Sequence, residues 1–531
     1  MSLRSDHAPF PRLPLAAVVA LAAIFLLSGL MRDPWKNEDA IHLGIAHAMA
    51  VDATWPFPHV AGEPWPHTAP LYHWVAAALG QILEGWLAFH EAARLATALF
   101  GALFLFALAR AAAAFDGPPS ARVAPLLALG TLGLLLPLHE TQPAVAGLAC
   151  AALAWWGGAT FLGENEPAGF ARWRNALLLG IGSGSAFLAH GLVGLLMVVA
   201  VLPAPTFRRD WPAFALALTI AGALAALWPL ALTAQAHDLW QAWWHNEWAE
   251  LWRSRRPPEA VHAELVAWGY WPILPLALWT LWLERRRLAP FSLPLLGAVL
   301  GLLWFVSGGT RLAALLPAMI PLLLIAAAGT ERLRRGAANA WDWFALMGFT
   351  FFGALIWLGA SAQALGWPPK VAANFAKIAP GHVADYAPLA LAWAAGLTLA
   401  WLWSWRLPRA PWRASLHWAA GVVLLWTLTT TLWFDWLDHH RSHRAVIASL
   451  RAALPTDAGC IERLGVGAPQ RALLDYHAGI RTRPPGGTPP CAWRLVIDRP
   501  ERATAPGWQV AWEGSRPGDR HERWFLERRA D

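Results

Sequence analysis

Charged residues are scarce in this chain of 531 residues. Asp, Glu, Lys and Arg make up 14% of it, whereas 57% of its residues are hydrophobic. Ordinary soluble domains carry roughly 25% charged residues. Apolar runs of about 17 to 25 residues recur along most of the chain, and this is the length that crosses the hydrocarbon core of a bilayer. The composition therefore excludes an ordinary soluble domain and predicts a polytopic helical membrane protein.

Other features are absent as well. The first apolar run, residues 13–30, has no small-residue cleavage site and is followed by further apolar runs, so we expect a retained helix and not a signal peptide. Only three cysteines occur. Cys150 lies in an apolar run and is expected to be a packing residue. Cys460 and Cys491 lie in the polar C-terminal part, where they can form a disulfide if that part faces an oxidising compartment.

The charges that are present are mostly basic, with a formal net charge of +7. They occur in short clusters between apolar runs, which favours arginine-rich cytoplasmic loops and argues against a nucleic-acid surface. The chain also has 37 tryptophans. We expect most of them to anchor helices at the membrane interface or to pack between helices, with some in the large loops free to stack on sugar rings.

The arginine clusters allow the topology to be worked out. Arg4 and Arg12 place the N-terminus in the cytoplasm, so the first helix delivers residues 35–74 to the outside. If residues 70–87 also crossed, every later arginine cluster would lie outside; we therefore expect this stretch to lie at the outer surface. About thirteen spanning helices remain. They are expected near residues 14–31, 92–114, 122–138, 143–162, 174–189, 191–205, 212–234, 264–283, 291–307, 312–329, 342–364, 387–404 and 416–434.

This topology brings polar segments from distant parts of the chain to the outer side. These are the turns at residues 139–142, 190–191 and 307–311, the loop 235–262, and the stretch 35–74. Trp and Leu recur at helical spacing in the loop, which predicts an amphipathic interfacial helix.

The polar C-terminal part is predicted to be a small α/β domain. Residues 445–453 are helix-like and residues 460–464 and 493–498 are strand-like, while residues 508–512 and 523–526 are expected to pair as a hairpin. The expected domains are 1–434, spanning the membrane with a first outer loop at 32–91, and 435–531, lying outside.

The stretch from Trp35 to Trp74 is the candidate site. It follows the first apolar run and holds an acidic pair, Glu38 and Asp39. Carboxylates and imidazoles cost free energy near a bilayer unless they face water, a partner or a substrate, so such a cluster indicates a functional site. Five histidines lie in the same stretch: His42, His47, His59, His67 and His73.

Four motifs in this order resemble a known family. The first is Trp-x-x-acid-acid, then a short helix, a Trp-Pro turn and x-x-x-Pro-Leu-Tyr-x-Trp, all within residues 35–74. The others are SAFLAHGLVGL at 185–195, WHNEW at 244–248, and FVSGGTRL at 305–312 followed by Leu-Pro. Together they resemble the bacterial membrane glycosyltransferases related to protein O-mannosyltransferases, which include the lipid A aminoarabinose transferase. The resemblance covers residues 10–330.

The resemblance implies a fold and a reaction. The fold is that of the C-type (GT-C) glycosyltransferases, an all-α polytopic membrane protein with a large first outer loop. The reaction moves a sugar, a hexosyl or pentosyl group, from a polyprenyl-phosphate carrier to a lipid A, glycan or protein acceptor, with inversion at the anomeric carbon. It implies the inner membrane of a bacterium, with the site and the C-terminal domain in the periplasm.

The resemblance also implies roles for individual residues. Glu38 and Asp39 occupy the acidic positions of the family, as catalytic groups or as ligands of a divalent cation; His67 is a further candidate ligand. The leaving phosphate needs cations or donors, which we assign to Arg311, His67 and His190. Substrate binding is assigned to Glu247, Glu140, Tyr72 and Trp74, of which the two aromatics are more often packing residues.

This chain departs from the family pattern at several of these positions. The acidic pair reads Glu-Asp where the family reads Asp-Glu, His190 and Arg311 replace lysines, Thr68 replaces another lysine, and Gln142 replaces an acid. These departures leave the donor sugar and the role of a metal open. They also leave open a degenerate relative or a flippase that only binds lipid-linked sugar, and an O-antigen-ligase-like enzyme. A flippase would place charges along a path through the membrane midplane, whereas here they gather at one face.

Overall fold

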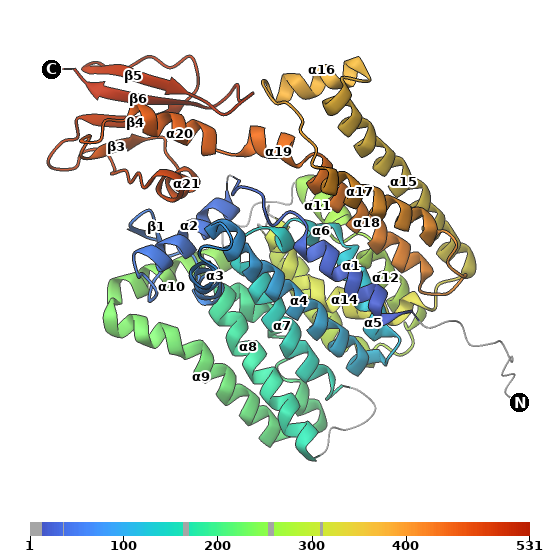
Figure 1. The fold of residues 1–531 in the computed structure, drawn as a ribbon. Helices are drawn as coiled ribbons and strands as arrows, with labels where there is room; N and C mark the ends of the chain where they lie inside the picture. The colour runs from blue at the N-terminus through green and yellow to red at the C-terminus, as the bar shows by residue number, and fades with distance from the viewer. Residues whose placement is uncertain (1–12, 36, 163–168, 253–259, 308–311, 531) are drawn as a thin grey trace, which may run out of the picture.

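The computed structural model describes residues 13–35, 37–162, 169–252, 260–307 and 312–530. Most of these residues are helical, and the helices form a bundle that carries a small β-sheet at one end (Figure 1). The predicted fold class is therefore confirmed in its coarse form. The candidate site lies at this end of the bundle, in the layer formed by the outer helices and strands.

Among the described residues, seven helices are long and apolar enough to cross a membrane. Two bent pairs, Ser120–Leu129 with Leu132–His139 and His262–Gly269 with Ile273–Leu283, raise the number to nine if each pair is one span. Three shorter apolar helices also occur: α1 (Leu15–Leu27), α7 (Pro143–Ala159) and α17 (Pro388–Ser404). The seven long ones contain α4 (Phe89–Asp116), α8 (Gly169–Val198), α9 (Trp211–Gln235), α13 (Ser292–Val306), α14 (Leu316–Thr330), α15 (Arg335–Leu365) and α18 (Arg413–Leu432).

The centre of the bundle is built around α14. Each of its residues from Leu316 to Thr330 is buried, which is typical of a helix that is apolar on all sides and enclosed by neighbours. It packs against α12 (Ile273–Leu283), α13 and α5 (Ser120–Leu129). A second layer, α4 with α7 and α8, packs beside it and carries the outer turns toward the candidate site.

Helix α8 reverses direction at His190 and Gly191, whose backbone angles are not helical. After this turn Gly194 lies so close to Ala186 that a Cβ on Gly194 would fall 2.0 Å from the Ala186 carbonyl oxygen. The returning arm follows α7 back, since the Trp155 indole donates to the Met197 carbonyl at 3.0 Å. The polar turn predicted at residues 190–191 is therefore present, and α8 comprises the helical arms on both sides of it.

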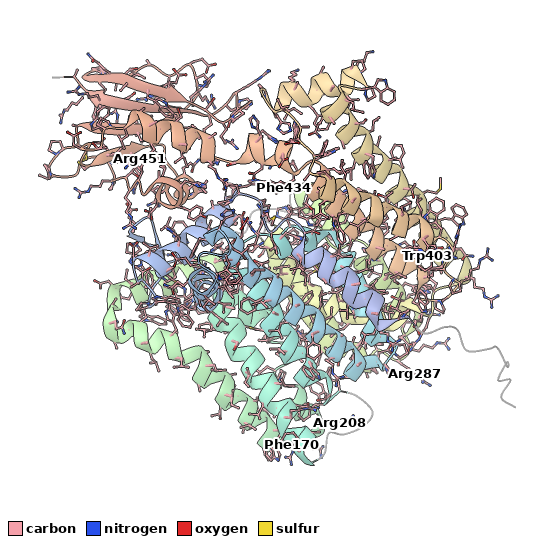
Figure 2. The ribbon with its side chains drawn as sticks, viewed as in Figure 1. Phe170, Arg208, Arg287, Trp403, Phe434 and Arg451 are labelled. Carbon is pink, nitrogen blue, oxygen red and sulfur yellow. A yellow bond between two sulfur atoms is a disulfide. The ribbon has the colours of Figure 1, made fainter. Side chains whose placement is uncertain are left out.

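The basic clusters lie together at the end of the bundle away from the strands. Arg172 pairs with Asp210 at 2.5 Å, which joins the start of α8 to the residue that precedes α9. Figure 2 labels Phe170, Arg208 and Arg287 at this end, whereas Arg451 lies beside the strands. The common position of these loops agrees with the topology predicted from the arginine clusters.

The first outer loop forms a small layer of its own. It contains α2 (Glu38–Val51), the short hairpin of β1 (His59–Val60) and β2 (Glu63–Pro64), and α3 (Leu71–Ile82). Helix α3 has 12 residues and is therefore about 18 Å long, too short to cross a hydrocarbon core of about 30 Å. It does not satisfy the criteria for a span, as expected for residues 70–87. The loop 235–262 likewise contains the expected helix, α10 (His237–Trp252).

The C-terminal part contains a four-stranded sheet in the order β3-β4-β6-β5. The strand predicted at residues 493–498 is confirmed, and the expected hairpin forms as the antiparallel pair β5·β6. The bounds are β3 (Ile461–Leu464), β4 (Trp493–Asp498), β5 (Trp508–Gly514) and β6 (Arg523–Arg529), with helices α19 (Phe434–Arg441), α20 (Arg444–Ala453) and α21 (Ala468–Ala478). Helices α21 and α16 (Pro369–Ile378) were not predicted.

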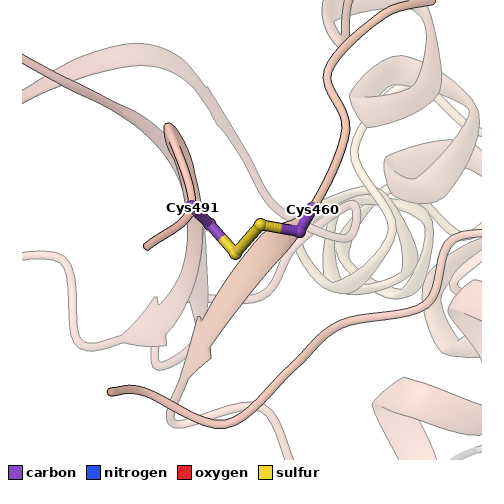
Figure 3. The surroundings of a disulfide bond; sticks show 2 residues. All are labelled: Cys460 and Cys491. Atoms are coloured by element: carbon purple, nitrogen blue, oxygen red, sulfur yellow. A yellow bond between two sulfur atoms is a disulfide. The ribbon is translucent and has the colours of Figure 1, made fainter. Parts of the chain in front are cut away.

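A disulfide joins Cys460 and Cys491, the residues that precede β3 and the segment leading to β4 (Figure 3). The conditional pairing inferred from the sequence is thus present in the structure. Cys150 is buried and unpaired within the bundle, as a packing residue should be.

Candidate functional site

The acidic pair begins helix α2, so that Glu38 and Asp39 occupy its first turn. The unsatisfied N–H groups and the positive end of the helix dipole favour carboxylates at this position. Successive residues of a helix point about 100° apart, and the pair divides accordingly. The Glu38 side chain is 32% exposed, whereas that of Asp39 is 2% exposed.

Asp39 is held in a buried ionic cluster. One carboxylate oxygen accepts from Arg32 at 2.8 Å and from Arg94 at 3.2 Å, and the other accepts from the Thr141 N–H at 2.7 Å. Burial alone raises the pKa of Asp39, but Arg32, Arg94 and the Thr141 hydrogen bond bring it down to about 2. Asp39 is therefore ionised and joins the ends of α1, α4 and α7 to the start of α2.

Arg32 and Arg94 were not predicted from the sequence as site residues. Arg94 is 1% exposed and also donates to the carbonyl oxygens of Leu30, at 2.6 Å, and Arg32, at 2.7 Å. A signal for both was available, since each lies at the outer end of a span, against the general preference of arginine for the cytoplasmic side. A basic residue in that position needs a partner, and here both arginines share Asp39.

Glu38 is connected to two histidines. Its carboxylate lies 3.2 Å from Nε2 of His42, one helical turn along α2. Nδ1 of His42 lies 3.0 Å from Nε2 of His73, which belongs to α3 and is fully buried. Burial, and then the neighbouring His42, hold the pKa of His73 well below its usual value, so that its ring is neutral at pH 7. The hydrogen bond between the two rings connects His73 through His42 to the Glu38 carboxylate.

His190 is brought to the same place by the reversal in α8. Its Cβ lies 2.8 Å from where a Cβ on Gly147 would be, so the glycine allows α7 to approach the turn closely. His190 is within electrostatic range of both His42 and Glu38. Residues 38 and 190, far apart in the sequence, therefore share one neighbourhood.

Glu247 attaches α10 to this turn. Its Oε2 accepts from the Leu192 N–H at 2.8 Å, and the side chain is 8% exposed. Burial raises the pKa of Glu247 to about 7, although the Leu192 hydrogen bond opposes the increase. The adjacent Asn246 donates to the Pro66 carbonyl at 2.6 Å, which places α10 beside His67. His67 itself lies against the Trp65 ring, with centroids 4.7 Å apart.

Glu140 lies in the turn before α7, next to the buried ionic cluster. Burial raises its pKa to about 7, and the charges of Asp39 and Glu38 add to the increase while Arg32 opposes it. Its carboxylate accepts a hydrogen bond from the Gln142 amide at 3.3 Å. Two carboxyl groups with different proton affinities, Asp39 and Glu140, thus lie close together.

The two aromatic candidates make loop contacts. Tyr72 is fully buried and its hydroxyl forms a hydrogen bond with Thr97 Oγ1 at 2.7 Å. The Trp74 indole donates to the Trp55 carbonyl at 2.8 Å. These contacts brace α3 within the outer layer. Arg311 lies outside the described residues, so its position relative to the others stays a prediction.

The candidate metal ligands do not form a ligand set in the described part of the chain. No group of three or more His, Cys, Asp or Glu side chains there could hold a metal ion. Both oxygens of Asp39 already accept from arginines or a backbone N–H, which leaves it poorly suited to a cation. We therefore assign no step to a divalent cation.

Comparisons with known proteins place this geometry in context. No family model matches the chain. It is 28% identical over 346 residues to an undecaprenyl phosphate-α-4-amino-4-deoxy-L-arabinose arabinosyl transferase from Pseudomonas aeruginosa strain UCBPP-PA14, covering 61% of this chain and 60% of that protein. A transferase of the same name from Aeromonas salmonicida is 31% identical over 189 residues, which are 31% of this chain and 34% of the relative. The longer match thus spans about 60% of its relative's length.

The structural comparison extends over almost the whole chain. The crystal structure of ArnT from Cupriavidus metallidurans bound to undecaprenyl phosphate superimposes with a TM-score of 0.68 and covers 96% of this chain and 97% of ArnT, at 18% identity. The fold is that of ArnT. The apo form of ArnT agrees, with a TM-score of 0.67. The resemblance inferred from the four motifs is thereby confirmed, and the ArnT fold extends it from residues 10–330 to the C-terminal part.

Proposed function

We propose that this protein is an inverting glycosyltransferase that moves a sugar from a polyprenyl-phosphate carrier to a lipid A, glycan or protein acceptor. The observation that carries the proposal is the meeting of Glu38, His42 and His190 at one end of the bundle, where the first, second and third motif segments come together. The relatives in sequence are named as transferases of a sugar linked to undecaprenyl phosphate. This supports undecaprenyl phosphate as the carrier.

The proposed setting is a bacterial inner membrane. Residues 1–434 form the spanning domain, with about thirteen crossings, and residues 435–531 form a second domain in the periplasm. The disulfide in the second domain supports an oxidising compartment. A membrane site suits such a donor, because the lipid tail stays in the bilayer while the phosphosugar reaches the outer surface.

Glu38 is the proposed base. An acceptor hydroxyl attacks the anomeric carbon from the side opposite the carrier, the bond to the phosphate oxygen breaks, and the polyprenyl phosphate leaves with the electron pair. Glu38 takes the hydroxyl proton, or orients the acceptor if that is a phosphate. The contact with His42 fixes the carboxylate and gives it a polar partner when its charge changes.

The other predicted residues surround this centre. His190, His67 and Arg311 are proposed to donate to the leaving phosphate, which becomes more negative in the transition state. Asp39 is proposed to position the start of α2 through Arg32 and Arg94. Glu247 and Glu140 remain proposed substrate-binding groups, with Tyr72 and Trp74 supporting the loop that presents the sugar.

The test compares Glu38→Gln with Glu84→Gln, an exposed carboxylate elsewhere in the outer loop. Each variant is expressed in a deletion strain, and mass spectrometry of lipid A, surface glycans and envelope proteins identifies the modified acceptor. We expect Glu38→Gln to lower transfer by at least about 100-fold, which is a typical contribution of a general base. Glu84→Gln should keep wild-type transfer.

Two results would contradict the proposal. Full transfer by Glu38→Gln would remove the role assigned to this carboxylate. A wild-type protein that binds the lipid-linked sugar but changes no acceptor in any fraction would instead favour the non-catalytic or flippase-like alternative.

A further inference from the structure

A polar cavity lies at the end of the bundle opposite the candidate site, between α15 and the α17–α18 turn. It has a volume of about 220 Å³ and is lined by Asn339, Asp342, Trp343, Trp405, Arg409 and Arg413, among others. These residues come from the ends of helices that carry basic clusters. None of them is part of the candidate transferase site.

The cavity has an excess of positive charge. Asp342 Oδ1 lies 2.5 Å from Nδ1 of the fully buried His417, whose Nε2 lies 3.2 Å from the Ser404 carbonyl oxygen. Among the described residues that line the cavity, Asp342 supplies the one carboxylate. The two positive charges of Arg409 and Arg413 therefore exceed the negative charge among the residues that line the cavity.

One arginine donor in the cavity forms a long ion pair but makes no hydrogen bond to a described residue. The Nε of Arg413 is buried and has no hydrogen-bond partner among the described residues. Nε pairs with Asp342 Oδ2 at 3.4 Å, while another guanidinium nitrogen donates to the Trp405 carbonyl at 3.3 Å. A buried donor of this kind loses free energy unless an acceptor reaches it. An anion entering the cavity would supply that acceptor.

The rim of the cavity has the side chains of a membrane interface. Trp343 is 63% exposed and Trp405 is 41% exposed, and both border the two arginines. Tryptophan concentrates at the level of lipid headgroups, and basic pockets between helices on the inner side are typical binding sites for phospholipid phosphates. The side chains of the rim are therefore those expected at the depth where such phosphates occur.

We propose that this cavity binds a phosphate group, either that of an anionic phospholipid or free phosphate, through Arg409 and Arg413. Both guanidinium groups can donate to phosphate oxygens in a forked geometry. Asn339 adds an amide donor at the same wall. The occupied site would tie α15 to the turn before α18 at the end of the bundle remote from the transferase site.

The experiment measures thermal unfolding of the full chain in detergent with three probes: phosphatidylglycerol, phosphatidylcholine and inorganic phosphate. Arg409→Gln is the main variant, because the Arg409 side chain is exposed and we expect the variant to fold. Arg413→Gln is the second variant, and Arg287→Gln is the control, an exposed arginine at the same end but outside the cavity.

We expect phosphatidylglycerol to raise the melting temperature of the wild type and of Arg287→Gln more than phosphatidylcholine does. In Arg409→Gln, the phosphatidylglycerol concentration that gives the same rise in melting temperature should be about tenfold higher. This is the change expected for the loss of one charge-assisted hydrogen bond. Protection by inorganic phosphate that competes with the lipid would identify a free-anion site; protection by the lipid alone would identify a headgroup site. An identical response of Arg409→Gln and the wild type to both phosphate probes would overturn the proposal.

Discussion

Glu38 and Asp39 are adjacent in the sequence yet differ in what surrounds them. Asp39 is buried between two arginines, whereas Glu38 is one-third open and contacts His42. The same chemical change, acid to amide, therefore has different consequences at the two positions. This contrast supports the two proposed roles, with Asp39 holding the fold and Glu38 acting on the substrate.

We expect Asp39→Asn to lower the free energy of unfolding by about 3 kcal/mol, because it leaves Arg32 and Arg94 buried without a counter-charge. Glu38→Gln should change stability little while it abolishes transfer. Thermal unfolding and transfer assays on the two variants measure this. A stable, folded Asp39→Asn protein would show that the ionic cluster does not hold the outer layer together.

The pKa of Asp39 sets the pH at which its contribution is present. Its folded-state value, about 2, lies below the usual 3.8, so the stabilisation is complete above pH 4 and is lost as the pH falls toward 2. Asp39→Asn should therefore reduce stability at neutral pH and have progressively less effect in that acidic range. The same thermal measurements repeated across pH test the sign.

At the scale of single elements, the turn in α8 depends on one glycine. Gly191 has φ of +56° and ψ of −140°, a region that side chains rarely adopt, and a Cβ there would fall 1.9 Å from an oxygen of Glu247. The turn fixes the position of His190 and that of the Leu192 N–H, which donates to Glu247. The glycine is therefore needed for the geometry of the site as well as for the fold.

We expect Gly191→Ala to destabilise the protein by about 2 kcal/mol through backbone strain, and to reduce transfer because Glu247 must move. Gly222→Ala in α9 is the matched control, since a Cβ there meets no atom within 4 Å. Alanine in an open helical position should leave the melting temperature unchanged or raise it. Equal melting temperatures for the two variants would contradict the role of the turn.

Elements with a strong local pattern could be predicted from the sequence. The long apolar helices follow from apolar length, and β4 from a run of β-formers bounded by polar residues. Helix α21 has no such pattern, because it is buried on two sides. Ala472 packs toward the outer loop, while Leu473 and Leu474 pack into the core beside the sheet. Because consecutive positions of α21 are buried, its apolar residues do not show the usual helical spacing.

The site was predictable only in part, for a related reason. Glu38 and His190 were predicted because they lie in motif segments, and the topology placed them on one side. The pairing of Asp39 with Arg94 joins residues 55 positions apart, and that of His42 with His73 joins residues 31 apart. Contacts of this kind depend on how helices pack, which a single sequence does not reveal.

At the scale of the whole molecule, the C-terminal part is attached to the outer loop by acidic residues of the loop. Glu63 accepts from Arg463 at 2.6 and 3.0 Å and pairs with Arg471. Asp33 is fully buried and accepts from Ser442 and Arg444. The backbones also approach closely, since a Cβ on Gly44 would fall 2.6 Å from that of Ala472.

We expect Glu63→Gln to loosen this attachment without unfolding the sheet. Amide hydrogen exchange in β1, β2 and the start of α21 should become up to about fivefold faster, as expected for a partly exposed ion pair worth no more than about 1 kcal/mol. Glu513→Gln is the control, since Glu513 pairs with Arg523 at 3.7 Å within the sheet. Exchange unchanged by Glu63→Gln would show that other contacts hold the two parts together.

The same variant decides what the C-terminal part contributes to transfer. Tyr476 of α21 forms a hydrogen bond with His90 at 2.8 Å, and His90 lies one helical turn from Arg94 in the ionic cluster. If the C-terminal part braces the outer loop, loosening it should lower transfer to every acceptor by a similar factor. If it selects the acceptor, Glu63→Gln should change the ratio between acceptors while the best one is used at the wild-type rate. Because the contacts of α21 lead toward Asp39, we expect transfer to all acceptors to decrease by a similar factor. The measurement is transfer from one donor to a lipid acceptor and to a glycan acceptor in parallel.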